Sequence, residues 1–176
     1  MNKNPATDAN HQTAGENSSQ NGDTALINQA NSIIAEWQDC AEKILKKYEE
    51  SLSLIHTEQG TLPVKTAADD FTYLAYPSIQ KKLKLPGDLS FIDEGARVTV
   101  AIQFQNKPRN VLRLYLCVIG KVQTPQWLYA ELQYQFGRPI AVLQEDLNGE
   151  LTTVNTRFKD WFSQIMETMF KSWLDT

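Results

Sequence analysis

The chain has 176 residues, 41% of them hydrophobic, which is enough for one domain with a sizeable core. Its net charge is −4 and its pI is about 5.2, which argues against a nucleic-acid-binding or anionic-membrane-binding surface. No run of about 18 apolar residues occurs, so we expect no membrane-spanning segment. The only two cysteines, Cys40 and Cys117, lie in predicted regular structure and favour reduced thiols in a cytoplasmic protein.

Residues 1–23 consist mostly of Asn, Gln, Ser, Thr, Asp, Gly and Ala. Such a segment buries too little apolar surface to offset the entropy of ordering it, so we predict a disordered polar tail. The rest of the chain, residues 24–176, is predicted to form a single α+β domain.

A long helix is predicted over residues 24–56, with Asp23 or Thr24 at its N-cap. Its apolar side chains follow one another at heptad spacing, which suits a helix docked on its own sheet or a helix paired with a second copy of the chain. Homodimerisation through this helix is therefore one expectation. The spaced residues are Ala30, Ile34, Trp37, Ala41, Ile44, Tyr48, Ser51 and Ile55.

Gly60 and Pro63 end this helix and begin a linker over residues 60–95. Residues 67–76 suit a short helix or an edge strand equally, and residues 77–85 suit another helical turn. Three lysines in the latter segment are typical of a solvated face, so we predict no nucleic-acid contact there.

An antiparallel β-meander is predicted over residues 96–154, because apolar and polar residues alternate with the period of half-buried strands. With residues 106–110 as a loop, Phe104 faces Leu112 and Ile102 faces Leu114. Asn148-Gly149 is a strong turn signal and predicts a further short strand over residues 150–154.

A C-terminal helix is predicted over residues 156–174, where apolar residues recur at helical spacing from Phe158 to Leu174. The fold class expected is therefore α+β. It comprises a four- to five-stranded antiparallel β-meander packed on the amphipathic C-terminal helix, preceded by the long N-terminal helix.

The second face of the meander carries aromatic and polar side chains of the kind that protein interfaces favour. A turn near Gln123 places Tyr115 opposite Glu131, with Arg113 diagonal to it. This face is predicted either to bind a partner or to lie under the long first helix. The predicted partner-binding residues are Arg113, Tyr115, Trp127, Tyr129 and Glu131.

Catalytic and metal sites are poorly represented. His11 and His56 are the only histidines, which leaves no base for a Ser or Cys nucleophile and no His-rich metal site. The weak catalytic candidates are Glu131 and Glu145, which lie opposite each other if residues 137–139 form a three-residue loop. We predict no metal and no cofactor.

Three functions fit these observations. The favoured one is a non-enzymatic protein–protein interaction module, such as an adaptor, a chaperone or a toxin-neutralising partner. The alternatives are a small apolar-ligand-binding domain, with its cavity between the sheet and the C-terminal helix, and a carboxylate-dependent hydrolase or isomerase.

Overall fold

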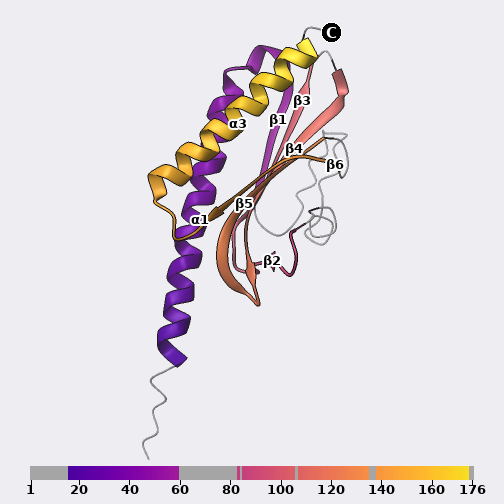
Figure 1. Ribbon diagram of the computed structural model, residues 1–176. Coiled ribbons are helices and arrows are strands. Elements are labelled where there is room, and N and C mark those ends of the chain that lie inside the picture. The colour runs from indigo at the N-terminus through magenta and orange to yellow at the C-terminus, as the bar shows by residue number, and fades with distance from the viewer. Residues whose placement is uncertain (1–15, 60–82, 84, 106, 135–137, 175–176) are drawn as a thin grey trace, which may run out of the picture.

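The computed structural model describes residues 16–59, 83, 85–105, 107–134 and 138–174 (Figure 1). Most of the predicted linker, including the segment 67–76, and most of the predicted tail lie outside these residues. Within these residues, two α-helices and an antiparallel sheet give the expected α+β class. The helices and strands are α1 (Glu16–Lys46), the short 3₁₀ helix η1 (Glu49–Ser51), β1 (Leu52–Gln59), β2 (Ser90–Phe91), β3 (Arg97–Phe104), β4 (Lys107–Lys121), β5 (Thr124–Tyr134), β6 (Arg138–Asp146) and α3 (Leu151–Leu174).

The first helix begins earlier than predicted. α1 starts at Glu16, so residues 16–23 belong to it rather than to the polar tail. The polar composition of residues 16–23 predicted disorder because these residues have little apolar surface to bury. A helix that already packs further along can extend into such residues at little additional cost, since nucleation is the expensive step.

The first helix also ends earlier than predicted. It stops at Lys46, and β1 occupies residues 52–59, where we expected the helix to continue. β1 pairs along its length with β3, from Leu52 opposite Phe104 to Gln59 opposite Val98. The prediction of helix here was wrong. Heptad spacing describes side-chain positions only and gives no information about a strand about 45 residues away that supplies backbone hydrogen-bond partners.

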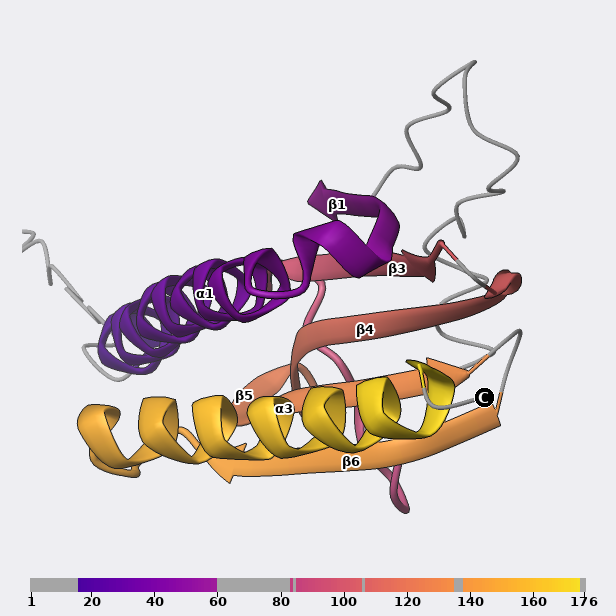
Figure 2. The same ribbon diagram turned by 90° about the horizontal axis from the view of Figure 1, so that it is seen from above.

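The strands follow one another in the order β1-β3-β4-β5-β6, and every pairing is antiparallel. β2 pairs with the end of β4. The meander is therefore confirmed, with β1 as an added strand at one end and β6 at the other (Figure 2).

The predicted register between β3 and β4 is wrong by two residues. Ile102 lies opposite Leu112, not Leu114, because the pairing is irregular after Gln103 and Phe104 comes opposite Lys107. β4 thus begins inside the segment that we expected to be a loop. A shift of two residues returns every side chain to the same face, so the division into two faces survived the error.

The register between β4 and β5 was predicted correctly. Tyr115 lies opposite Glu131, and the turn contains Val122 and Gln123 with positive φ angles of 50° and 62°. Two consecutive left-handed residues are typical of the tight turns that suit the right-handed twist of paired strands.

The C-terminal helix begins at Leu151 rather than at residue 156, and the strand predicted over residues 150–154 is absent. The Asn148-Gly149 turn is present: the Gly149 N–H donates to the Asp146 carbonyl oxygen over 3.1 Å. It leads into α3 because Val154 becomes buried when the chain turns helical there. A turn signal does not by itself specify the element that follows.

Both helices lie on the aliphatic face of the sheet (Figures 1 and 2). The apolar side of α1 and the apolar side of α3 meet each other and the strands in one core cluster. Trp37 and Phe158 stack with ring centroids 4.6 Å apart, and Tyr48 stacks on Phe170 at 3.9 Å. The buried helical residues include Ile27, Ala30, Ile33, Ile34, Trp37, Ala41, Ile44 and Leu45 of α1 and Val154, Phe158, Phe162, Met166 and Phe170 of α3.

Candidate functional site

The predicted partner-binding residues lie together on the second face of the sheet, away from the two helices. β4 and β5 bring Tyr115 opposite Glu131, and Tyr129 lies two residues from that glutamate on the same face. Four of the five residues are buried, namely Arg113, Tyr115, Tyr129 and Glu131, whereas Trp127 is half-buried. Their grouping is as expected, but a partner could reach them only if the cover of this face moved, so their binding role stays a prediction.

Glu131 organises the polar contacts of this face. The Tyr129 hydroxyl donates to Glu131 Oε1 over 2.8 Å, and Gln133 Nε2 donates to Oε2 over 2.5 Å. A carboxylate that is only 1% exposed needs such donors, because burial without them would cost several kcal/mol. The cluster thus holds β5 in a defined conformation.

The two tyrosines remain neutral over the physiological pH range. Burial, with a further contribution from Glu131, raises the pKa of Tyr115 to about 12, although the nearby Arg113 guanidinium opposes this. Burial and then the hydrogen bond to Glu131 raise the pKa of Tyr129. Neither hydroxyl therefore serves as a base at neutral pH, and that of Tyr129 donates a hydrogen bond to Glu131.

Apolar residues that precede the meander cover part of this face. They pack against a cluster that contains Tyr115, Cys117 and Tyr129. Burial raises the pKa of the Cys117 thiol, which makes it a poor nucleophile. The covering residues are Leu83, Leu85, Leu89 and Phe91. The prediction that the long first helix covers this face is wrong, because α1 packs on the opposite one.

The proposed carboxylate pair does not form. Glu131 lies opposite Val142, and Glu145 lies opposite Leu128, so the two carboxylates are on different faces of the sheet. The pairing is irregular next to Pro139, which decides the register of this hairpin. On the helical face, Glu145 accepts a hydrogen bond from Arg157 Nη1 of α3 over 3.0 Å. This geometry removes the basis for the hydrolase or isomerase hypothesis.

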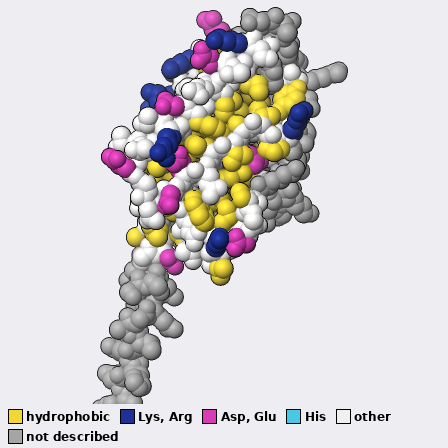
Figure 3. Space-filling view, in the orientation of Figure 1, with side chains coloured by type: hydrophobic (Ala, Val, Ile, Leu, Met, Phe, Trp, Pro, Cys, Tyr) yellow, Lys and Arg dark blue, Asp and Glu magenta, His cyan; other side chains and the backbone are white. Residues whose placement is uncertain are grey.

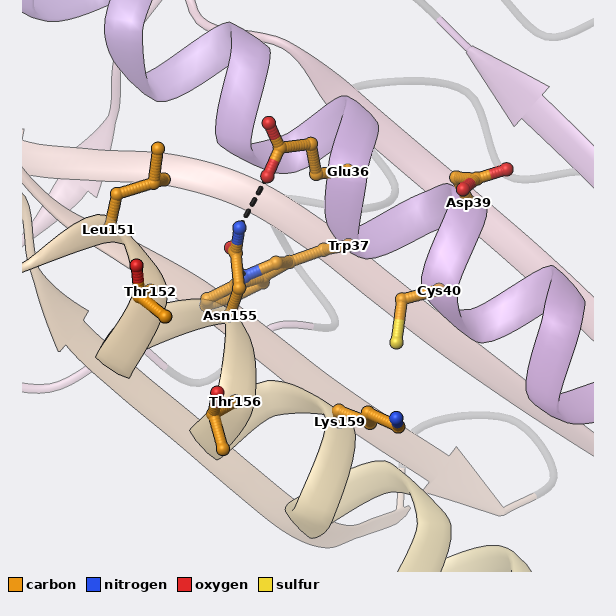
Figure 4. Close-up of a pocket in the computed structure, with 9 residues that line it drawn as sticks. All are labelled: Glu36, Trp37, Asp39, Cys40, Leu151, Thr152, Asn155, Thr156 and Lys159. Atoms are coloured by element: carbon orange, nitrogen blue, oxygen red, sulfur yellow. Dashed lines mark hydrogen bonds between the residues drawn. The ribbon is translucent and has the colours of Figure 1, made fainter.

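A groove of about 450 Å³ lies between α1 and α3 (Figure 4). Trp37 Nε1 donates to Asn155 Oδ1 over 3.1 Å, and Asn155 Nδ2 donates to the Glu36 carboxylate. Cys40 and Lys159 face the same gap from opposite walls. Burial raises the pKa of the Cys40 thiol, and Lys159 only partly opposes this shift, so the thiol stays protonated at neutral pH. The groove side chains therefore mainly join the two helices.

β6 forms one edge of the described sheet. β6 pairs with β5 on one side, and no described strand pairs with its other side. Apart from Glu145, all its residues are at least partly exposed, and Val142 is 47% exposed. From Pro139 to Gln144 the strand carries no charge. Open strand edges of this composition are templates for pairing with another chain.

A groove of about 320 Å³ between α3 and β6 extends this apolar surface. Figure 3, which has α3 and β6 in front, shows hydrophobic side chains gathered on this side of the molecule. The groove residues are uncharged, namely Ile140, Ala141, Gln164, Ile165, Thr168 and Met169. The β6 edge and this groove together are called the β6–α3 surface below.

No protein-family model, no curated protein and no solved structure matches this chain. Its function therefore has to be inferred from its own residues.

Among the residues that the structure describes, no three His, Cys, Asp or Glu side chains are grouped to hold a metal ion. The two cysteines are free thiols. No helix in the described part of the chain is both long and apolar enough to cross a membrane.

The β6–α3 surface was not predicted from the sequence. A signal was available, because the last strand of a meander is an edge and Pro139–Gln144 is an uncharged run. The alternation of apolar and polar residues indicates which face of a strand is buried. It does not indicate an edge, because an edge is defined by unpaired backbone groups.

Proposed function

We propose that this protein is a protein–protein interaction module that binds an extended segment of its partner along the β6–α3 surface. The main support for this proposal is the edge of β6, with which no described strand pairs on the outer side. The central residues of this strand are uncharged and partly exposed. A strand added there gains main-chain hydrogen bonds to β6, and its alternate side chains contact the α3–β6 groove.

This surface replaces the two that the sequence suggested. The heptad-spaced stripe of α1 is already buried against α3 and the sheet, so it offers no open seam to a partner. The aromatic and polar face has most of its members buried. A partner can reach the edge of β6 without displacing any covering residues, because most residues of this strand are accessible in the folded chain.

Natural edge strands are protected by proline, by bulges or by charges. In β6 these features lie at the ends: Pro139 and the register irregularity at one, Glu145 and Asp146 at the other. The register irregularity falls at Ile140, and the middle of the strand from Ala141 to Gln144 lacks all three features. Because only the ends of β6 carry these protective features, its central residues remain able to pair with a strand of a partner.

Selection from a phage-displayed library of nine-residue peptides on the full-length protein tests the proposal. The variant Val142→Lys places a charge in the middle of the edge and should weaken binding of the selected peptides by about tenfold. Val122→Lys, the same change at a 92% exposed turn position away from β6, is the matched control and should bind normally. Gln144→Lys is a second edge variant.

Selected peptides are expected to carry apolar or β-branched residues at alternate positions and to slow amide hydrogen exchange in β6. Peptides that bind Val142→Lys and Gln144→Lys as well as the unmodified chain would overturn the proposal, provided that circular dichroism shows both variants folded. Failure to enrich any strand-forming peptide would count against it equally.

The apolar-ligand alternative rests on the α3–β6 groove rather than on a cavity beneath α3. The residues of α3 that face the sheet, such as Phe158 and Phe162, are fully buried and stacked. The groove, at about 320 Å³, is at the small end of ligand sites. Native mass spectrometry of the gently purified full chain tests it: a reproducible adduct that Met169→Lys abolishes supports this function, and the bare protein mass excludes it.

A further inference from the structure

The sequence of β6 is complementary to itself when one copy is reversed. The strand has nine residues with Val142 at its centre. Arg138 stands at its start, Glu145 and Asp146 stand at its end, and the residues between are uncharged. Two copies running in opposite directions would therefore bring a basic end beside an acidic end twice, once on each side of Val142.

We propose that the partner bound by β6 is the β6 edge of a second copy of this chain, related by a two-fold axis at Val142. This inference rests on the proposed function and specifies the occupant of the same surface. The exposed Val142 then lies opposite its symmetry mate, and Ala141 lies opposite Leu143 of the other copy. Each Arg138 lies opposite the exposed Asp146 of the second strand, whereas Glu145 stays paired with Arg157 of its own chain.

The charges select both the direction and the occupant. Parallel pairing would set Arg138 beside Arg138 and the two acidic ends beside each other, which is unfavourable. A two-fold axis perpendicular to the sheet generates antiparallel strands only, so symmetry and charge agree. An unrelated apolar segment would lack the two oppositely charged ends at the spacing of this strand.

The neighbouring helix contributes to the same contact. α3 runs along β6 (Figure 2), so the two-fold axis would bring α3 of each copy alongside the other. The side chains that border the groove on α3 carry no charge, and Ile165 and Met169 are only partly buried in the single chain. The second copy would cover these residues and make one continuous sheet from the two molecules.

Sedimentation velocity of the full chain over a wide concentration range tests this inference. The unmodified chain is expected to dimerise, and Val142→Lys should make it monomeric. Arg138→Glu alone and Asp146→Arg alone should each raise the dimer dissociation constant by roughly tenfold, because symmetry makes each change act twice. The double variant Arg138→Glu with Asp146→Arg should restore dimerisation. Lys121→Glu, a charge reversal on the exposed β4–β5 turn, is the control and should change nothing.

A chain that stays monomeric at all concentrations would overturn the two-fold pairing. A dimer that persists in Val142→Lys, or a double variant that is no better than the single ones, would also overturn it. These results leave the proposed function to be judged by the peptide selection, which needs no second copy. Failure of the peptide selection together with a dimer that ignores β6 substitutions would overturn both.

Discussion

Trp37 in α1 donates a hydrogen bond from its indole Nε1 to Oδ1 of Asn155 in α3, over 3.1 Å. The same indole stacks on Phe158, with the ring planes 9° apart. The Trp37 side chain thus joins α1 to α3 through both a hydrogen bond and a ring stack. Trp37 and Asn155 both line the groove in Figure 4.

The first prediction separates these two roles of Trp37. Trp37→Phe should keep much of the stacking but lose the hydrogen bond, which lowers the free energy of unfolding by about 1 kcal/mol. Trp37→Ala should lower it by about 3–5 kcal/mol, because it also leaves a cavity. Urea denaturation measures both. Lys43→Ala, on the exposed side of the same helix, should leave the midpoint unchanged.

The second prediction concerns the glutamate at the centre of the buried polar face. Glu131→Ala should destabilise the fold by about 1–3 kcal/mol, because the Tyr129 hydroxyl and the Gln133 amide lose their acceptor. The sequence placed Glu131 among the predicted partner-binding residues, a role in which its replacement would leave the fold intact. Thermal unfolding decides between the two. If Glu131→Ala unfolds at the temperature of the unmodified chain, Glu131 has no stabilising role in this cluster.

The third prediction is a pH dependence that arises from Tyr115. Its pKa is about 12 in the folded chain against 10.0 for an ordinary tyrosine, so above pH 10 the folded state holds its proton more tightly than the unfolded state. Stability should therefore fall as the pH rises from 10 to 12, and this contribution is fully present below 10. Tyr115→Phe should reduce the fall, although Tyr129 contributes in the same direction. Urea midpoints at about pH 9 and about pH 11 measure the difference.

The fourth prediction contrasts two glycines. A Cβ on Gly120 would lie 1.7 Å from the backbone oxygen of Thr124, so Gly120→Ala must distort the β4–β5 turn and should cost at least about 2–3 kcal/mol. A Cβ on Gly22 meets nothing within 4 Å, and this residue lies inside α1. Gly22→Ala should therefore raise the free energy of unfolding by about 0.5–1 kcal/mol.

The contrast between these glycines also tests α1 itself. If residues 16–23 were disordered, as their composition suggested, Gly22→Ala would leave the unfolding midpoint where it is. Helical content measured by circular dichroism on the full chain and on a chain that lacks residues 1–23 gives an independent reading. A loss of helical signal on truncation is the expected result.

The periodicity of the sequence determined the α+β class, the existence of the strands β3 to β5 and the apolar side of α3. These features depend on which residues alternate at two or at about 3.6 positions, and that information is local. The pairing of Tyr115 with Glu131 also followed, because a tight turn leaves few registers open.

Only the tertiary structure decided the rest. The end of α1, the origin of β1, the two-residue offset between β3 and β4 and the separation of Glu131 from Glu145 all depend on contacts between residues far apart in the chain. Several arrangements satisfy the same local pattern, and the packing of both helices on one face selects among them. Apolar residues before the meander cover much of the predicted binding face, and no described strand pairs with the outer side of β6. Local patterns do not determine either feature, because both depend on which segments become neighbours in the folded chain.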